Sequence, residues 1–541
     1  MTQEPNKPLF DRDCGVLLHP SSLPNPYEIG DFGPAALRWI DQLREHQQNL
    51  WQVLPLHPCG YGNSPYQALS AFAGNPLFLS PQDLQQRGLL SPGELRSLLV
   101  PLSGSVDYTK AYRSKAWLSA CVASRFFGSD GRDAALHRRY SQFLDSASWW
   151  LEDYALYATL KALHGGQSWT DWAEPFRDRD PAALEQVAYE HQAQMNRVCL
   201  EQFLLREQWR KVRKHANACG VRIIGDLPIF VAHDSADVWC RPDLFRLDRQ
   251  GRPLVVAGVP PDYFSETGQL WGNPLYDWPV HQAESFSWWR RRIGEVLNWV
   301  DIVRIDHFRG FSACWEVPAE AQTAVDGHWV DVPGEDLFAC IAEDLGWPLP
   351  FIAEDLGVIT PDVRRLQERF GLPGIRIEQF AFGNDALKHT FLPGAYDSNC
   401  VAYTGTHDND TVQGWFGKQP GVNCTMSWEE IESERAEALA YFGTDGSRLH
   451  WDFIHSLYSS DAGAAIVPLQ DVLGLGSEAR MNVPGAASGN WAWRVSQANA
   501  ACLGDALYQL SDISTRSHRG LARSGGGSKR PAAMNLQTKA T

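Results

Sequence analysis

The chain lacks the sequence patterns that define several large classes of protein. In 541 residues there is no uninterrupted apolar run near the ~18 residues that a membrane helix needs, and Met1–Asp13 contains no apolar signal core. No Gly-x-Gly-x-x-Gly turn follows an apolar run, and there is no Walker-type phosphate loop. We therefore expect no membrane span, no secretion signal and no nucleotide cofactor.

The cysteines follow none of the spacings expected of a disulfide framework or a zinc site. There are 11 of them, an odd number, they are scattered along the chain, and no two are spaced as Cys-x-x-Cys. We expect no structural metal, no cofactor of any kind and a reducing compartment, namely the cytoplasm.

Positive charge is scarce relative to negative charge. The 48 Lys and Arg residues are outnumbered by 64 Asp and Glu residues, which gives a formal net charge of −16. A charge of this sign opposes binding to phosphate backbones and to anionic membrane surfaces, so nucleic acids and membranes are not expected partners. Aromatic residues are abundant: the 22 Trp, 16 Tyr and 24 Phe exceed what a core alone requires, which favours ring contacts to a neutral or cationic ligand.

Eight short apolar runs recur along the chain, each ending in a polar or charged residue and a turn former. Such runs are typical of buried parallel strands. Helix-like stretches lie between them, for example Ala35–His46 and Pro361–Phe370, the latter with Thr360 as its N-cap. Alternating strands and helices predict a (β/α)8 TIM barrel. The predicted strands are Gly15–His19, Trp51–His57, Val221–Phe230, Val300–Phe308, Leu349–Leu356, Gly374–Phe382, Cys400–His407 and Ala464–Leu469.

Two long segments interrupt this alternation and divide the chain. We expect the first barrel strands and the N-terminal loop in 1–80, an inserted helical subdomain in 81–215, and the rest of the catalytic barrel in 216–495. Residues 232–285 are rich in Pro, Gly, Trp and Tyr with little periodicity, so we interpret them as a long loop insertion over the C-terminal face. The C-terminal extension, 496–541, carries six Lys or Arg and no acid from residue 516 onward, which predicts a disordered, solvated tail there.

Four acids stand near the ends of predicted strands, each after an apolar run, namely Asp226, Asp306, Glu354 and Asp408. In a TIM barrel the catalytic groups come from the C-terminal ends of the strands, so these side chains should meet at one rim. Any single acid could instead be structural, capping a helix or pairing with a base. Like charges held close together push their pKa values apart, which leaves one acid protonated beside an ionised neighbour. Such a cluster, with many aromatic rings and no metal-type His spacing, favours chemistry at a glycosidic bond.

Neighbouring residues distinguish two of these acids. Arg304 lies two residues before Asp306 and hence on the same side of the strand, where its charge should keep Asp306 ionised as a nucleophile. Glu354 follows an apolar Pro-Phe-Ile-Ala run, which should raise its pKa and suit a proton donor. The same Glu-Asp-Leu-Gly tetrapeptide begins at Glu343, but there it closes a helix-like pattern, so we assign Glu343 to a helix end.

A series of long motifs accompanies these acids. They are Gly60–Gln67, Gly225–Trp239, Gly258–Tyr276, the strand with Arg304 and Asp306, Ala353–Thr360, Thr406–Asp410 and Met481–Val495. In this order they resemble glycoside hydrolase family 77, the 4-alpha-glucanotransferases of the amylomaltase or disproportionating-enzyme type. The resemblance covers nearly all of the chain from Gly15 to Val495.

The resemblance implies a role for each candidate residue in a retaining double displacement. Asp306 would be the nucleophile, Glu354 the general acid and then base, and Asp408 the transition-state stabiliser. The implied substrate-binding residues are Arg304, His407 and Asp226 in the donor subsite, Tyr61 and Tyr66 as sugar-stacking rings, and Tyr263, Phe264 and Trp271 in a loop that covers the cleft. The third-strand motif Asp-Leu-Pro-Ile-Phe lacks the Asn-His of typical α-amylases, so no calcium site of that kind is expected, and the tail after Val495 has no counterpart in the family pattern.

The implied activity moves a segment of a 1,4-alpha-D-glucan to a new 4-position on an acceptor glucan or glucose. Its substrates would be maltooligosaccharides and glucans of the starch or glycogen type, and the sequence leaves the oligomeric state open. One alternative is an α-1,4-glucan hydrolase of amylase type on the same barrel. Another is a silent carbohydrate-binding or scaffold protein, against which the complete set of Asp306, Glu354 and Asp408 argues, since only catalysis needs a paired acid and nucleophile.

Overall fold

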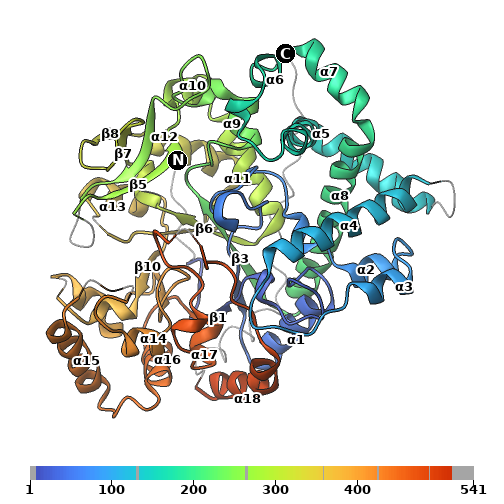
Figure 1. The fold of residues 1–541 in the computed structure, drawn as a ribbon. Coiled ribbons are helices and arrows are strands. Elements are labelled where there is room, and N and C mark those ends of the chain that lie inside the picture. Colours follow the sequence, from blue (N-terminus) through green and yellow to red (C-terminus); the bar gives the residue numbers. More distant parts are fainter. Residues whose placement is uncertain are drawn as a thin grey trace.

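The fold is a closed barrel of eight parallel strands, in the order β1-β12-β11-β10-β9-β6-β3-β2 (Figure 1). The structure is a computed structural model that describes residues 8–128, 133–261, 266–357, 359–384, 386–422, 424, 426–486 and 488–513. Each barrel strand overlaps one of the eight predicted apolar runs, so the predicted (β/α)8 barrel is confirmed. The strands are β1 (Asp13–Leu17), β2 (Leu50–Gln52), β3 (Arg222–Pro228), β6 (Ile302–Asp306), β9 (Phe351–Ala353), β10 (Gly374–Ile377), β11 (Cys400–Tyr403) and β12 (Ala464–Pro468).

The barrel strands are buried on both faces, which is why they appear in the sequence as continuous apolar runs rather than as alternating patterns. All five residues of β1 and of β12 are buried. The strands also approach closely: a side chain at Gly15 would collide with the backbone oxygen and Cβ of Leu50 in the neighbouring strand β2. A glycine is therefore required at that position of β1.

Helices of the barrel cover the outer surface of the strands. Two of them, α1 (Pro34–Glu45) and α13 (Pro361–Arg369), coincide with the helices predicted from the sequence. Thr360 occupies the N-cap position of α13, although its side chain makes no capping hydrogen bond. Glu343 lies in the last turn of α12 (Gly334–Leu345), as predicted. Further helices between β3 and β12 include α11 (Ser287–Trp299), α14 (Val412–Gly417), α15 (Trp428–Phe442) and α16 (Leu449–Ser459).

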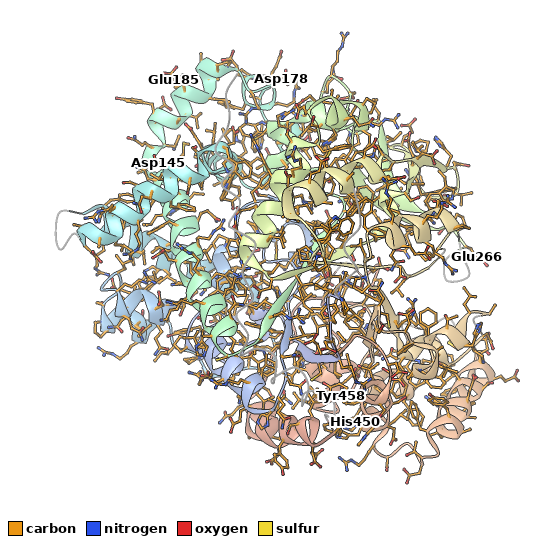
Figure 2. The ribbon with its side chains drawn as sticks, turned by 180° about the vertical axis from the view of Figure 1, so that it is seen from behind. Asp145, Asp178, Glu185, Glu266, His450 and Tyr458 are labelled. Carbon is orange, nitrogen blue, oxygen red and sulfur yellow. The ribbon has the colours of Figure 1, made fainter. Side chains whose placement is uncertain are left out.

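A group of helices lies between β2 and β3 on one side of the barrel (Figure 1). Figure 2 shows Asp145 and Glu185 on two of these helices at the edge of the molecule. The last of the group is anchored to the barrel layer, because the buried Trp209 donates from Nε1 to the carbonyl oxygen of Trp299 at 2.6 Å. The helices are α2 (Pro81–Gln86), α3 (Pro92–Ser97), α4 (Tyr108–Phe127), α5 (Ala134–Leu163), α6 (Glu174–Arg177), α7 (Pro181–Glu190) and α8 (Gln192–Ala218).

The segment 232–285 differs from the predicted long loop, because it contributes to a second sheet. Four antiparallel strands pair in the order β5-β4-β7-β8, and they enclose a small core of their own around Val256, Val317 and Ala324. Two of its four strands, β7 and β8, follow β6 in the sequence, so no local periodicity within 232–285 could reveal the sheet. The strands are β4 (Val255–Val259), β5 (Gln269–Pro274), β7 (Ala313–Pro318) and β8 (His328–Asp331), and the segment also holds α9 (Ala236–Cys240) and α10 (Trp278–Ala283).

The C-terminal part of the described chain packs back onto the barrel. After α17 (Leu469–Val472), the helix α18 (Gln497–Ile513) buries Leu503, Leu507 and Leu510. The predicted disordered tail from about residue 516 lies outside the described residues. None of the helices in the described ranges combines the length and apolarity needed to cross a membrane.

A buried arginine ties the end of the barrel domain to its beginning. The guanidinium of Arg494 donates to the carbonyl oxygens of Tyr27 at 2.6 Å and of Asn25 at 2.8 Å, and the side chain is almost completely buried. Burial lowers the pKa of Arg494 to about 10, with the charge of Asp31 acting in the opposite direction. Tyr27 and Asn25 are themselves buried, so their carbonyl oxygens depend on this guanidinium for a donor, and the contact fixes the loop that follows β1.

We expect Arg494→Ala to lower the free energy of unfolding by about 2–4 kcal/mol, because it leaves buried carbonyl oxygens without donors and opens a cavity. Urea denaturation of the purified chain measures this change. The control is Arg210→Ala, whose side chain is 70% exposed and which should change stability by no more than about 0.5 kcal/mol. Equal effects of the two substitutions would contradict the proposed anchoring.

Candidate active site

The acids predicted to meet do lie at one mouth, the C-terminal end of the barrel. Asp226 and Arg304 are register partners on β3 and β6, and Asp306 is the last residue of β6. Glu354 follows β9 directly, and His407 and Asp408 lie in the loop after β11. The parallel arrangement places all these strand ends on the same face.

Arg304 is shared between two of the acids. Its Nη1 atom lies 2.8 Å and 2.9 Å from the two carboxylate oxygens of Asp226, and 2.9 Å from Oδ1 of Asp306. The side chains of Arg304 and Asp226 are 5% and 0% exposed. Burial lowers the pKa of Arg304, but the two carboxylates raise it, and the net direction is upward. The guanidinium therefore stays charged, and its charge compensates for the buried carboxylates.

Asp306 remains partly accessible, with 29% of its side chain exposed. Burial raises its pKa to about 6, Arg304 acts to lower it, and Asp226 acts to raise it. The effect of Arg304 has the sign expected from the sequence, but burial outweighs it. Asp306 is still ionised at neutral pH, so its carboxylate is available as a nucleophile.

Glu354 is the second acid of the pair, and its pKa is also raised. Burial raises its pKa to about 7, with Arg304 lowering it and Asp306 raising it further. The backbone N–H groups of His307 and Leu356 donate to its two carboxylate oxygens, at 2.7 Å and 2.9 Å. His307 adopts a left-handed conformation with φ of 54°, unusual for a residue other than glycine, immediately after Asp306. That turn aims the His307 amide at Glu354 and so fixes the second acid relative to the first.

Asp408 is held by residues that the sequence reasoning did not single out. The side-chain amide of Asn482 donates to Asp408 Oδ1 at 2.6 Å, and Arg480 donates to the Asp408 carbonyl oxygen at 2.6 Å. His407 Nε2 lies 3.4 Å from Asp408 Oδ2. The Asp408 side chain is 46% exposed, so it faces solvent at the mouth while its backbone is fixed. Asn482 falls within the Met481–Val495 motif, and this motif is the feature of the sequence that could have pointed to it.

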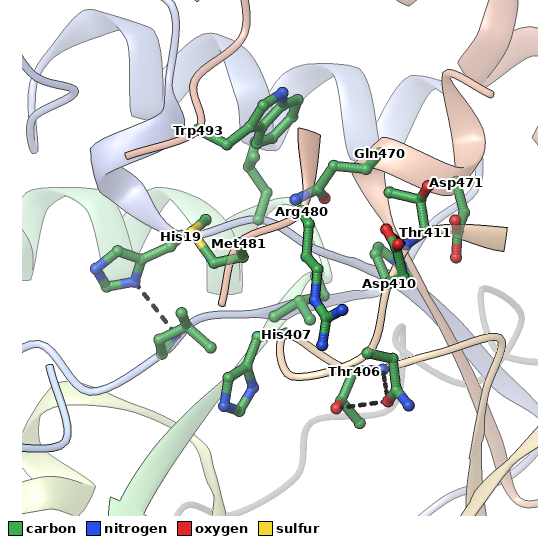
Figure 3. Close-up of a pocket in the computed structure, with 15 residues that line it drawn as sticks. His19, Thr406, His407, Asp410, Thr411, Gln470, Asp471, Arg480, Met481 and Trp493 are labelled. Atoms are coloured by element: carbon green, nitrogen blue, oxygen red, sulfur yellow. Dashed lines mark hydrogen bonds between the residues drawn. The ribbon is translucent and has the colours of Figure 1, made fainter. Parts of the chain in front are cut away.

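A small cavity lies beneath this loop (Figure 3). Its volume of about 20 Å³ suffices for roughly one water molecule, far less than a glucose ring. His19, Asp410 and Arg480 are among the residues that line it. The cavity lies against the 406–411 loop, and His407, one of the predicted substrate-binding residues, also lines it.

The aromatic residues predicted to contact sugars differ in their surroundings. Tyr61 is 80% exposed on the turn after β2. The hydroxyl of Tyr66 donates to Asp226 Oδ2 at 2.8 Å, and its ring stacks on His407 with centroids 5.0 Å apart. Trp271 in β5 packs edge to face on His307, with ring centroids 4.7 Å apart, so the second sheet contacts the residue that follows Asp306. Tyr263 and Phe264 lie outside the described residues.

Comparisons with known proteins agree with this geometry. The model of glycoside hydrolase family 77, described as 4-alpha-glucanotransferase, matches residues 18–499. The 4-alpha-glucanotransferase of Thermus thermophilus is 47% identical over 493 residues, 90% of this chain and 95% of that protein. The chloroplastic/amyloplastic 4-alpha-glucanotransferase DPE1 of Arabidopsis thaliana is 43% identical over 490 residues, 90% of this chain and 81% of that protein. The amylomaltase of Streptococcus agalactiae, solved in complex with acarbose, superimposes with a TM-score of 0.87 at 35% identity and covers 94% of this chain and 100% of its own.

The raised pKa of Asp306 predicts a stability cost. Since the folded state binds this proton more readily than the unfolded chain, ionisation between about pH 4 and pH 6 destabilises the fold. We expect Asp306→Asn to raise the free energy of unfolding by about 1–2 kcal/mol at pH 8, and the gain to become small near pH 4, where the folded wild-type chain is already protonated at Asp306.

Urea denaturation at the two pH values measures this difference. Asp461→Asn is the control, because the Asp461 side chain is 86% exposed. If Asp306→Asn raised the free energy of unfolding equally at both pH values, ionisation of Asp306 would not be the cause of the increase.

Proposed function

The chain belongs to glycoside hydrolase family 77, the 4-alpha-glucanotransferases, and from this premise we propose that Asp306, Glu354 and Asp408 carry out its reaction. The activity itself is 4-alpha-glucanotransfer: a segment of a 1,4-alpha-D-glucan is moved to a new 4-position on an acceptor, with retention at the anomeric carbon through a glucosyl-enzyme intermediate. The alternatives of a hydrolase and of a silent binding protein are set aside, since the relatives reported above are transferases or an amylomaltase.

In the first half of the reaction, we propose that the Asp306 carboxylate attacks the anomeric carbon of the donor. The bond between that carbon and the glycosidic oxygen breaks, and Glu354 donates its proton to the departing oxygen. The leaving glucan carries a new 4-hydroxyl, the donor segment is esterified to Asp306, and Glu354 is left as a carboxylate.

In the second half, the Glu354 carboxylate takes the proton from the 4-hydroxyl of an acceptor as that oxygen attacks the anomeric carbon. The ester to Asp306 breaks, the nucleophile is regenerated, and Glu354 is protonated again. Two inversions give net retention. Asp408, fixed by Asn482 and partly exposed, would stabilise the positive charge that develops on the sugar ring in both transition states.

The observation that carries this assignment is the position of Arg304, which pairs with Asp306 at 2.9 Å and makes no ion pair with Glu354 among the described residues. A neighbouring positive charge favours the ionised form of Asp306, as a nucleophile requires. Burial is the largest cause that raises the pKa of Glu354, which favours the protonated form that a general acid requires.

For substrate binding we propose that Arg304 and His407 form the wall of the donor subsite and that Tyr61 offers its exposed ring to a glucan chain. The side chain of Asp226 is fully covered, so we propose that it acts by holding Arg304 and the hydroxyl of Tyr66. Tyr263 and Phe264 are proposed cleft-covering residues on the grounds of the family motif alone. The proposed substrates are maltooligosaccharides and glucans of the starch or glycogen type, with glucose as an acceptor; the acarbose complex of the Streptococcus amylomaltase supports a binding site for such ligands.

We also propose a cytoplasmic location, for which the odd number of scattered cysteines is the support. The domain division at residues 80, 215 and 495 is likewise a proposal; the helices α2–α8 between β2 and β3 support the helical insertion.

For transfer to occur, a sugar acceptor must react with the glucosyl-enzyme intermediate in preference to water. Water is present at tens of molar and an acceptor at about millimolar concentration, so transfer needs a preference of roughly 10⁴, or about 5.5 kcal/mol. Effective molarities of ~10⁵ M for well-placed groups make this attainable if the acceptor is held and water is excluded. We propose that the motif Gly258–Tyr276 supplies this exclusion, since its Trp271 packs on His307 beside the nucleophile.

Incubation with maltotriose, with products resolved by size, tests the assignment. We expect glucose together with maltodextrins longer than the substrate from the wild-type chain, and a loss of at least about 10³-fold in rate for Asp306→Asn, because no covalent intermediate can form. Asp461→Asn serves as the matched control. Undiminished transfer by Asp306→Asn would refute the assignment of the nucleophile.

Trp271→Ala should raise the ratio of hydrolysis to transfer by about tenfold or more, because removal of the indole admits water beside the intermediate. Tyr66→Ala should raise it too, although it also disturbs Asp226. The ratio of reducing ends formed to longer maltodextrins measures the effect. Trp329→Ala, which truncates an exposed indole on β8 of the same sheet, is the control, and an unchanged ratio for Trp271→Ala counts against a water-excluding role.

A further inference from the structure

Three side chains with different metal-binding chemistry meet at the end of the barrel opposite the catalytic mouth. Asp41 lies on α1, His215 lies in the last turn of α8, and Cys219 follows that helix directly. Strand β3 begins three residues after Cys219 and carries Asp226 toward its other end. The trio is therefore separated from the acids at the mouth by the length of a barrel strand.

The geometry of the trio is compact. His215 Nε2 lies 2.7 Å from Asp41 Oδ1, and Cys219 Sγ lies 3.8 Å from His215 Nε2 and 3.9 Å from Asp41 Oδ1. His215 and Cys219 are four residues apart at the end of one helix, the spacing that places two ligands on the same face. Helices α1 and α8 pack together, so Asp41 is presented to that face by the neighbouring helix.

These separations match the edges of a tetrahedral metal site. With bonds of about 2.3 Å to sulfur and about 2.0–2.1 Å to nitrogen and oxygen, tetrahedral angles require about 3.5 Å between sulfur and each of the other ligands and about 3.3 Å between nitrogen and oxygen. Both sulfur distances agree to within about 0.4 Å. The nitrogen–oxygen distance is shorter because these two atoms share a proton, and a metal ion that replaced the proton would move them apart.

The surroundings leave one coordination position open. The Asp41 side chain is 59% exposed and that of His215 is 35% exposed, whereas Cys219 is buried. A thiolate, an imidazole and a carboxylate with a water molecule form a ligand set that suits Zn²⁺ and similar borderline cations.

We propose that Asp41, His215 and Cys219 form a binding site for Zn²⁺, or for a cation of like chemistry such as Co²⁺, that joins α1 to the end of α8. The site lies on the face of a TIM barrel where residues contribute to stability rather than to catalysis. Binding fastens the helix after β1 to the residues that lead into β3, and its effect is on unfolding and not on transfer. The sequence could not indicate it, since 174 residues separate Asp41 from His215.

Cobalt provides the direct test, because a thiolate bound to Co²⁺ gives a ligand-to-metal charge-transfer band in the near ultraviolet that carboxylates and imidazoles do not. We expect the wild-type chain, with its thiols reduced, to develop this band to saturation at one equivalent, and Zn²⁺ to displace it. Cys219→Ser should abolish the band, and Asp41→Asn, a substitution on an exposed side chain, should weaken cobalt binding at least about tenfold. Cys502→Ser, which removes an exposed thiol on α18, should leave the band intact.

Thermal unfolding supplies the second readout. At a Zn²⁺ concentration of about a hundred times the dissociation constant, the melting temperature of the wild-type chain should rise by about 2 °C, and that of Cys219→Ser should not rise. The rate of maltotriose disproportionation should be equal in the wild-type chain and in Asp41→Asn. No charge-transfer band in the wild-type chain, or an undiminished band in Cys219→Ser, would overturn the proposal.

Discussion

One buried guanidinium makes the mouth of this barrel possible. Arg304, 5% exposed, neutralises Asp226 on one side and contacts Asp306 on the other. A buried arginine is costly unless charged partners surround it, and clustered carboxylates are costly unless a cation is among them. Each group compensates for the other, and the arginine pairs with Asp306 at 2.9 Å, whereas the described residues include no ion pair between it and Glu354. The proposed difference in role between the two acids rests on that asymmetry.

Much of this arrangement could be predicted from the sequence because parallel barrel strands are buried on both faces. Their residues form unbroken apolar runs, and the acids found near the ends of four of these runs are placed by the fold at a common rim. The two copies of Glu-Asp-Leu-Gly could be separated by what precedes them, a helix pattern before Glu343 and a strand before Glu354. The direction of the Glu354 pKa shift followed from its apolar neighbours, since burial is the largest cause of that shift.

Features that depend on pairing across long sequence distances could not be predicted. The second sheet joins strands on either side of β6, so the segment 232–285 has no periodicity of its own. The support of Asp408 by Asn482 and the contact of Trp271 with His307 likewise join residues that only the closed barrel brings together. For Asp306 the sequence indicated the opposing charge of Arg304 but not that burial would outweigh it, because the depth of a carboxylate below the rim is set by the whole fold.

We propose that Asp306 and Glu354 act on the same bond, one as nucleophile and the other as acid. Mass spectrometry of a trapped intermediate distinguishes these roles. In Glu354→Gln, α-maltosyl fluoride can still transfer its sugar, because fluoride leaves without a proton, whereas the intermediate decays slowly without a base. We expect digestion to yield one peptide carrying a single maltosyl group, esterified at Asp306. A maltosyl group on any other residue, or fluoride release with no labelled peptide, would contradict it.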